Sequence, residues 1–279
     1  MPKVLTEQPE ALRPYLFHGV DLSWDRTNAT GDCPWCGADG KFSISVETGV
    51  WRCWVCGEGN DRGGGNVYTF LRKLWEVSDR ATTDYHDLAK DRGLMPDTLV
   101  HWELAKSILT GDWLVPGYSI DGRLCQLYRY VRTAKRKLLM PTPPKEKLGH
   151  QLFGVNLYRA DCKIIYLCEG PWDGMKLWEA LGSHKESDQG LIATANVDRS
   201  LLRDASVLAT PGAWGIKEQW LPLFKDKIVY LCFDNDHPKV NEQTGKLSQP
   251  AGYAGMERVA KMLAGTAKEI YRINWKTRH

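Results

Sequence analysis

Residues 228–236 read IVYLCFDND, an apolar run that ends in two aspartates separated by one residue. In an extended strand successive side chains alternate between faces, so Asp234 and Asp236 point to the same side. Two carboxylates held this close repel each other and favour protonation of one of them, unless a divalent cation offsets their charge. The stretch therefore predicts a buried strand that ends at a metal-binding site.

An apolar strand followed by an acid also occurs upstream, in KIIYLCEG, which ends at Glu169. Between and after the two strands the segment types alternate, and this pattern predicts an α/β fold with a parallel sheet and covering helices. In such sheets functional residues gather at the carboxyl ends of the strands. The segments are helix WDGMKLWEALG, strand GLIATA, helix DRSLLRDA, apolar SVLATPG, helix IKEQWLPLF, the 228–236 strand, helix GYAGMERVAKML and strand EIYRINW.

Oxygen ligands at this edge suit Mg²⁺ or Mn²⁺, which keep several waters and also bind phosphate oxygens. We expect Glu169, Asp234 and Asp236 to hold such ions, which can activate an attacking hydroxyl and neutralise a leaving pyrophosphate. Two plainer explanations stay open. The aspartate pair could form a turn, and Asp173 falls in the first turn of a helix, where the helix dipole alone favours a carboxylate.

A small unit near the N-terminus contains two C-x-x-C pairs separated by 16 residues. This spacing is typical of a closed tetrahedral zinc site, and the stretches KFSISV and GVWRCW around ETG predict a hairpin that brings the pairs together. The predicted zinc ligands are Cys33, Cys36, Cys53 and Cys56.

The tryptophans of this unit have two possible roles. Trp35, Trp51 and Trp54 could stack on unpaired bases, or they could pack the hairpin. Arg52 and Lys41 could likewise meet phosphates or base edges. The sequence does not separate these readings.

Residues 123–147 carry eight cations and one acid, Glu146. Several of the cations alternate with Leu127, Tyr128 and Tyr130, so we expect them along one side of a sheet, where they would attract polyphosphate or a nucleic acid backbone. The cations are Arg123, Arg129, Arg132, Lys135, Arg136, Lys137, Lys145 and Lys147.

Composition sets broad limits. With 279 residues and 43% hydrophobic content the chain can form two or three compact units, and 37 basic against 34 acidic residues give a net charge of only +3. We expect a cytoplasmic protein without membrane association, because no signal peptide or long apolar run is found. Cys125, Cys162, Cys168 and Cys232 lie in or beside apolar strands, and we expect them to be inert core residues.

Several collinear stretches together resemble one family. They are CPWC with WRCWVC and GGGNVYTFLRK; DRGL with WLVPGYSIDGRLCQLYRY; KRKLLMP with QLFGVNLYRA; and CEGPWDGMKLWEALG with CFDND and AGYAGMERVA. In this order they resemble the DnaG-type primases of bacteria and phages, most closely the phage-encoded forms. The C-terminal part resembles the TOPRIM fold that these enzymes share with topoisomerases.

The resemblance implies three domains: a zinc ribbon over residues 1–80, a basic mixed α+β domain over 85–158, and a TOPRIM catalytic domain over 159–279. It implies synthesis of RNA primers for DNA replication by two-metal-ion nucleotidyl transfer. The expected cofactors are structural Zn²⁺ and catalytic Mg²⁺ or Mn²⁺. The expected partners are a single-stranded DNA template, ribonucleoside triphosphates and a replicative helicase.

The resemblance also implies residue roles. Glu169, Asp234, Asp236 and Asp173 match the catalytic acids. Lys137 falls where these enzymes keep a lysine for nucleotide or template phosphates, and Lys147 lies within a residue of another. Arg129, Arg132 and Lys135 are grouped with these lysines as nucleotide- or template-binding residues.

The chain departs from the family pattern at three places. Many bacterial relatives have a histidine where this chain has Cys36, a loop of unknown role at 237–250 follows the aspartates, and the chain ends near where bacterial enzymes supply a further acidic pair. We therefore expect a compact phage version, a fragment, or another metal arrangement.

Two functions are alternatives to primer synthesis: a non-catalytic module that binds single-stranded DNA, and a TOPRIM nuclease or topoisomerase. A topoisomerase needs a large strand-passing domain, for which the chain has no obvious room.

Overall fold

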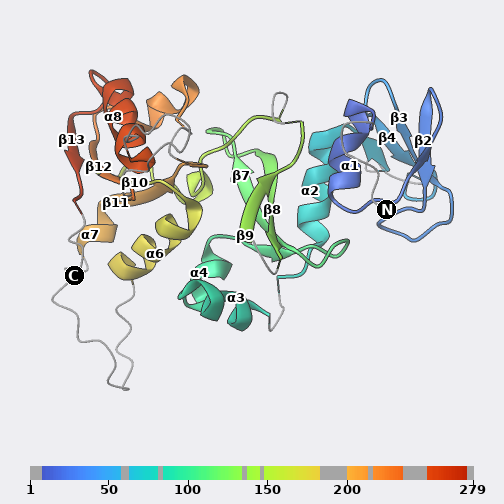
Figure 1. Ribbon diagram of the computed structural model, residues 1–279, viewed down its shortest axis with the longest axis horizontal. Coiled ribbons are helices and arrows are strands. Elements are labelled where there is room, and N and C mark those ends of the chain that lie inside the picture. Colours follow the sequence, from blue (N-terminus) through green and yellow to red (C-terminus); the bar gives the residue numbers. More distant parts are fainter. Residues whose placement is uncertain are drawn as a thin grey trace, which may run out of the picture. The chain divides into compact units, whose positions relative to one another are not determined.

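The computed structural model describes residues 8–57, 63–80, 84–133, 137–144, 148–182, 200–212, 216–234 and 250–274 (Figure 1). It contains two compact units, and each is described by itself. The first comprises Met1–Thr82, Glu103–Gly117 and Leu124–His150, and the second comprises Thr83–Trp102, Tyr118–Arg123 and Gln151–His279. The predicted division into three domains stays a prediction.

The first unit begins with a five-stranded antiparallel sheet in the order β1-β2-β3-β4-β5. In its two central strands Phe42, Ile44, Trp51 and Cys53 are buried, while the residues between them point to the other face, as the alternation in the sequence predicts. The strands are β1 Ser23–Trp24, β2 Asn28–Gly31, β3 Phe42–Ser45, β4 Trp51–Cys53 and β5 Gly64–Gly65.

Helices cover the buried face of this sheet. In α2, Val67–Val77, the buried residues Phe70, Leu71 and Leu74 lie on one face, as the helical spacing of the apolar residues in NVYTFLRKLW predicts. Asn66 caps this helix, because its side chain accepts hydrogen bonds from the backbone N–H groups of residues 68 and 69. The short helix α1, Arg13–Phe17, follows the 3₁₀ turn η2, Glu10–Leu12, and packs into the same core.

A second sheet of the first unit has the order β6-β7-β8-β9. Its central strand contains the fully buried Gln126, whose amide donates to the carbonyls of Thr142 and Gly149 and whose oxygen accepts from the backbone N–H groups of Leu127 and Thr142. All four hydrogen-bonding positions of this buried amide are therefore satisfied. The strands are β6 Ala105–Lys106, β7 Trp113–Tyr118, β8 Leu124–Arg132 and β9 Lys137–Pro141.

His18 connects the helix α1 region to this sheet. The His18 ring is fully buried, and its Nε2 lies 2.8 Å from the Thr142 hydroxyl. That hydroxyl donates to the Leu127 carbonyl, so Nε2 is the donor to Thr142 and the ring is neutral. Burial, and then the positive charge of Arg129, lower the pKa of His18 to about 3.

This lowered pKa predicts a loss of stability in acid. The unfolded chain binds a proton at His18 below about pH 6.5, whereas the folded chain does not until about pH 3. The contribution of the neutral His18 ring to the free energy of unfolding is therefore fully present above pH 6.5 and is lost as the pH falls from 6.5 towards 3. Relative to a His18→Gln variant, the wild type should lose up to about 1.4 kcal/mol of unfolding free energy per pH unit. Denaturant unfolding of both proteins between pH 7 and pH 4.5 measures the difference, and parallel curves would contradict it.

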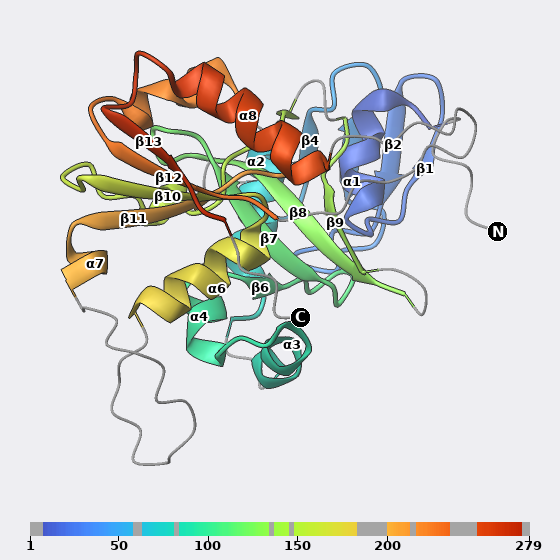
Figure 2. The ribbon, with the colours of Figure 1, turned by 60° about the vertical axis from the view of Figure 1, so that its left-hand side comes forward.

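The second unit is built on a four-stranded parallel sheet in the order β11-β10-β12-β13. The chain starts at the inner strand β10, moves outward to β11, and then continues on the other side of β10 with β12 and β13. Because parallel crossovers are right-handed, connections that run in opposite directions place their helices on opposite faces. Figure 2 shows α6 and α8 on the two faces. The strands are β10 Ile164–Cys168, β11 Ala205–Ala209, β12 Ile228–Cys232 and β13 Glu269–Arg272.

The main core of this unit lies on the face covered by α8, Ala251–Leu263. Side chains from the inner strands, such as Leu167 and Leu231, pack there with Met256, Val259 and the buried Trp220. On the other face, α6 packs on β10 and β11. The remaining helices are α3 Tyr85–Arg92, α4 Pro96–His101 and α7 Ser200–Arg203, with the 3₁₀ segments η3 Val155–Leu157 and η4 Glu218–Phe224; α6 spans Pro171–Gly182.

The predicted α/β class and parallel sheet are confirmed. The segment IKEQWLPLF differs from the prediction of an ordinary helix, because Glu218–Phe224 is a 3₁₀ helix with Pro222 inside it, and proline cannot donate the hydrogen bond that an α-helix interior needs. The strand predicted at 190–195 lies outside the described residues.

Candidate functional site

The four predicted zinc ligands lie together in the first unit. Cys33 and Cys36 follow β2, Cys53 ends β4, and Cys56 follows it in the next turn. Two pairs of sulfurs, Cys33 with Cys56 and Cys36 with Cys53, are each 3.8 Å apart, and all four Sγ atoms lie within 4.8 Å of one another. The hairpin therefore gathers both C-x-x-C turns around one point.

This arrangement fits zinc. A tetrahedral site with Zn–S bonds of about 2.3 Å has sulfur–sulfur edges of about 3.8 Å. Burial works to raise the pKa of Cys53, but the backbone N–H of Cys56 and a hydrogen bond from Cys33 outweigh it and lower the pKa to about 7. Burial, and then hydrogen bonds with neighbouring thiols, raise the pKa of Cys56, and burial raises that of Cys33, so zinc binding has to displace protons from these thiols.

Replacing Cys53 should remove the metal and loosen the sheet around it. We expect a Cys53→Ser variant to lose its bound zinc and to unfold at lower temperature, because zinc takes the place of part of the core in so small a unit. A Cys125→Ser variant is the control, since Cys125 lies outside the cluster. Zinc content by mass spectrometry and thermal unfolding test this, and full retention of zinc by Cys53→Ser would contradict it.

The second constellation lies at the carboxyl edge of the parallel sheet, which we define as the ends of β10 and β12. The two strands pair with Cys168 opposite Cys232, so their ends are level. Glu169 follows β10 directly and Asp234 follows β12 after one further residue. This edge is also where the strand order reverses direction, the usual place for a ligand site in an open α/β sheet.

The carboxylate of Glu169 lies between two stretches of neighbouring backbone. Its carboxylate oxygen Oε2 accepts a hydrogen bond of 3.3 Å from the backbone N–H of Asp234. The first turn of α8 closes in from the other side, because a Cβ at Gly252 would lie 2.4 Å from the Asp234 carbonyl oxygen and 2.9 Å from Glu169 Oε2. Only a glycine allows this approach.

Asp173 joins the same edge from the first turn of α6. Partial burial, and then the negative charge of Asp234, raise the pKa of the Asp173 carboxyl, while Arg92 and Lys176 act in the opposite direction. Arg92 is positioned by stacking on the ring of Trp172, with its guanidinium carbon 4.3 Å from the ring centroid. Two carboxylates are thus close enough to repel, with two cations beside them.

The chemistry of these donors fits a hard divalent cation, because all are carboxylate oxygens and a cation would relieve the repulsion between Asp173 and Asp234. Among the described residues, however, the four cysteines are the one group of three or more potential ligands whose atoms gather closely enough to share an ion. Asp236 lies outside the described residues.

Filling the space at Gly252 should disturb this edge. Alanine normally stabilises a helix by about 1 kcal/mol relative to glycine. We expect Gly252→Ala instead to lower the free energy of unfolding by about 1–3 kcal/mol, because its methyl group overlaps the Asp234 carbonyl. Tyr253→Ala, at the exposed neighbouring position of α8, is the control. Denaturant unfolding compares the two, and a stabilised Gly252→Ala would refute the close approach.

The predicted basic surface is only partly described. Arg129 is engaged within the first unit, where its guanidinium pairs with Asp112 and donates to the carbonyl of Phe17. Arg132 is exposed and lies opposite the exposed Lys137 in the pairing of β8 with β9. The prediction that these cations share one side of the sheet is wrong for the two arginines, since they lie three positions apart in one strand and side chains alternate between its faces. Lys135 and Lys147 lie outside the described residues.

The tryptophans of the zinc-binding sheet divide into two groups. Trp51 is buried and Trp35 packs against the same core, so both stabilise the hairpin. Trp54 is 54% exposed, and the Arg52 guanidinium carbon lies 4.1 Å from its ring centroid. On the face opposite the core, strand register aligns Ser23, Thr30 and Ser43 with Arg52. We call these three residues the hydroxyl row.

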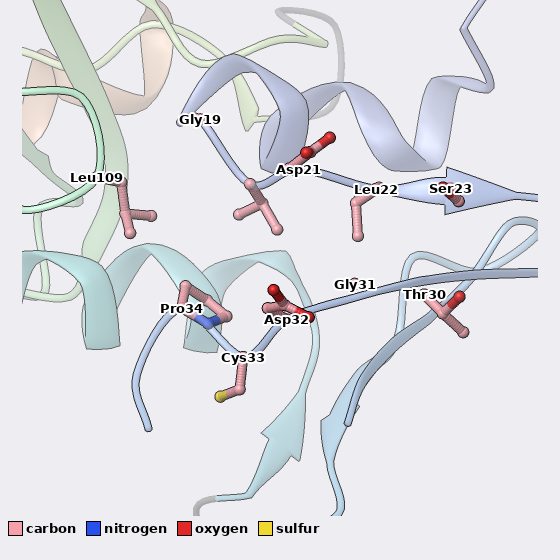
Figure 3. Close-up of a pocket in the computed structure, with 11 residues that line it drawn as sticks. Gly19, Asp21, Leu22, Ser23, Thr30, Gly31, Asp32, Cys33, Pro34 and Leu109 are labelled. Carbon is pink, nitrogen blue, oxygen red and sulfur yellow. The ribbon is translucent and has the colours of Figure 1, made fainter. Parts of the chain in front are cut away.

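A cavity of about 340 Å³ lies at one end of the hydroxyl row. It is lined by residues 19–23 and 30–34 together with Leu109. Figure 3 shows the two stretches running alongside each other, with Leu22 pointing into the space between them. Asp32 also lines the cavity, and its Oδ1 accepts a hydrogen bond from the backbone N–H of Gly40.

Some residues near the acids are not singled out by the sequence. Arg92 falls within DRGL and Lys176 within the helix after Glu169, but nothing in their spacing connects them to the carboxyl edge. Thr210 ends an apolar strand and its hydroxyl lies 2.9 Å from the Glu169 carbonyl oxygen. Only the tertiary structure brings these side chains to the site.

No family model matches the sequence, and no curated protein matches it in sequence. Among solved structures, the zinc-binding and RNA polymerase domains of the Aquifex aeolicus primase superpose with a TM-score of 0.50 at 15% identity, over 99% of this chain and 79% of that one. The chain has the fold of a DnaG-type primase. The primase fragment of the bacteriophage T7 primase-helicase protein aligns over 91% of this chain and 90% of its own, with a TM-score of 0.44 at 15% identity. A DNA primase domain from Pseudomonas aeruginosa aligns over 70% and 66%, with a TM-score of 0.44 at 16% identity.

The primase fold includes the elements described above: a cysteine-rich antiparallel sheet, a second sheet and a parallel sheet with helices on both faces. Within the residues that the structure describes, every helix is too short or too polar to cross a lipid bilayer.

Proposed function

We propose that the protein is a primase, an RNA polymerase that joins ribonucleoside triphosphates on a single-stranded DNA template and releases pyrophosphate. The observation that carries the proposal is the level pairing of β10 with β12, which brings Glu169 and Asp234 to neighbouring strand ends and links them by a hydrogen bond. The primase fold is consistent with this activity but does not establish it.

In this proposal Glu169, Asp234 and Asp236 bind Mg²⁺ or Mn²⁺, and Asp173 completes the acidic edge. When bound, two such ions activate the attacking hydroxyl and neutralise the leaving pyrophosphate. Glu169 also helps to remove the proton of that hydroxyl. Its two backbone neighbours, Asp234 and Gly252, limit its motion, so the carboxylate is held ready for this role.

We propose further that single-stranded template binds to the exposed face of the zinc-binding sheet. An aromatic ring supported by a guanidinium suits an unpaired base, and Arg52 with Trp54 provides both. The hydroxyl row can donate to base edges or to phosphate oxygens. Arg132, Lys135, Lys137 and Lys147 are proposed as further phosphate contacts, whereas Arg129 already pairs with Asp112.

The synthesis assay tests the central proposal. With single-stranded templates of varied sequence, four ribonucleotides and Mg²⁺ or Mn²⁺, we expect short labelled RNA, and Glu169→Gln should reduce it by about a hundredfold or more. Glu257→Gln is the control, because it removes the same charge from a residue of α8 that forms an ion pair with Arg272 of β13. Template binding without RNA would point to a non-catalytic module, and cleaved or relaxed DNA would point to a nuclease or topoisomerase.

Trp54 provides the test of the template surface. Loss of one stacked base should weaken single-stranded DNA binding by Trp54→Ala about tenfold or more. Tyr68→Ala, which removes another exposed aromatic ring of the same unit, should bind as the wild type does. Fluorescence anisotropy with a labelled oligonucleotide measures both, and equal weakening by the two variants would count against a specific role for Trp54.

A replicative helicase as partner remains a prediction of the resemblance, and a cytoplasmic location remains a prediction from the lack of a signal peptide and of a long apolar run in the sequence.

A further inference from the structure

Thr210 directly follows the last residue of β11, and its side chain is fully buried. Its backbone N–H donates to the Cys168 carbonyl at 2.9 Å, which extends the pairing of β11 with β10 by one residue. Its hydroxyl oxygen lies 2.9 Å from two carbonyl oxygens, those of Glu169 and Gly212. Both carbonyls belong to turns that leave the carboxyl edge.

We propose that Thr210 is a positioning residue for Glu169. The hydroxyl fixes the main chain of Glu169 where it leaves β10, and this keeps the carboxylate within reach of the Asp234 backbone N–H. The inference rests on the proposed role of Glu169 in binding a divalent cation. It adds a residue that touches neither the metal nor the substrate.

The geometry explains why a hydroxyl is needed here. Besides this contact at its main chain, Glu169 is held through its carboxylate, which accepts a hydrogen bond of 3.3 Å from the Asp234 backbone N–H and packs against Gly252. A valine at 210 would fill the same volume but would remove this donor from the Glu169 carbonyl, and the turn would lose the hydrogen bond.

The support for Thr210 is itself rigid. Phe153 and Ala209 exchange two backbone hydrogen bonds, so the outer side of β11 is paired at the residue before Thr210. The hydroxyl has one proton for three carbonyl acceptors, those of Glu169 and Gly212 at 2.9 Å and that of Cys168 at 3.4 Å, and through it the turn after β10 is tied to the turn after β11. A movement of one turn therefore displaces the other through this shared hydroxyl.

The experiment compares hydroxyl loss at two points of one strand. Thr210→Val removes the hydroxyl at the carboxyl edge, and Ser206→Ala removes a buried hydroxyl earlier in β11 that accepts from the backbone N–H of Arg159. Mn²⁺ binding to the full chain is measured by electron paramagnetic resonance without nucleotides or template, and Glu169→Gln identifies the signal from the carboxyl edge. Thermal unfolding reports the structural cost of each change.

We expect Thr210→Val to weaken Mn²⁺ binding about tenfold, while Thr210→Ser and Ser206→Ala bind as the wild type does. Unchanged binding by Thr210→Val, or equal weakening by Ser206→Ala, overturns the inference. If Thr210→Val does not fold, Thr210→Cys against Thr210→Ser makes the same comparison of a poor donor with a good one. Wild-type protein without a signal sensitive to Glu169→Gln overturns the proposed metal role itself, which separates the two failures.

Discussion

The parallel hydrogen bonding of β10 with β12 is the constraint on which the candidate site depends. Parallel strands in register end at the same height, so residues that follow each strand are brought together although 65 positions separate Glu169 from Asp234 in the chain. The acidic edge then needs no loop of special shape. It needs only that two apolar runs of equal length are each followed by an acid, and that nothing bulkier than glycine enters from α8.

The first unit depends on other sources of stability, because a sheet of five short strands buries little apolar surface of its own. It combines a four-cysteine cluster that fits zinc with shared packing: the cysteines lie together at one end, and the buried face packs with α1, α2 and the neighbouring sheet. His18 and Gln126 add buried hydrogen bonds, both to Thr142, and the loss of either partner would leave a buried polar group unsatisfied. The exposed face carries small hydroxyl side chains and Trp54, which stacks with Arg52, and these side chains do not contribute to the core.

Much of this arrangement follows from the sequence. The spacing of the cysteines fixes their chemistry, the 3.6-residue period predicts α2, and apolar runs ending in acids predict the parallel strands. What the sequence does not contain is the direction of individual side chains. Arg129 belongs to a basic segment, yet it pairs with Asp112, and three tryptophans with similar neighbours differ in exposure. Arg92 and Thr210 act through contacts that are distant in the chain, for which no local pattern exists.

The two edge strands of the parallel sheet, β11 and β13, differ in what protects their outer edges. Ala209 of β11 pairs with Phe153, whereas β13 is four residues long and carries Glu269 at its start and Arg272 at its end. Short length and charge are features that discourage a second molecule from adding its own strand. The sheet is therefore guarded against the addition of strands from other molecules by backbone pairing at one border and by a short edge strand with charged ends at the other.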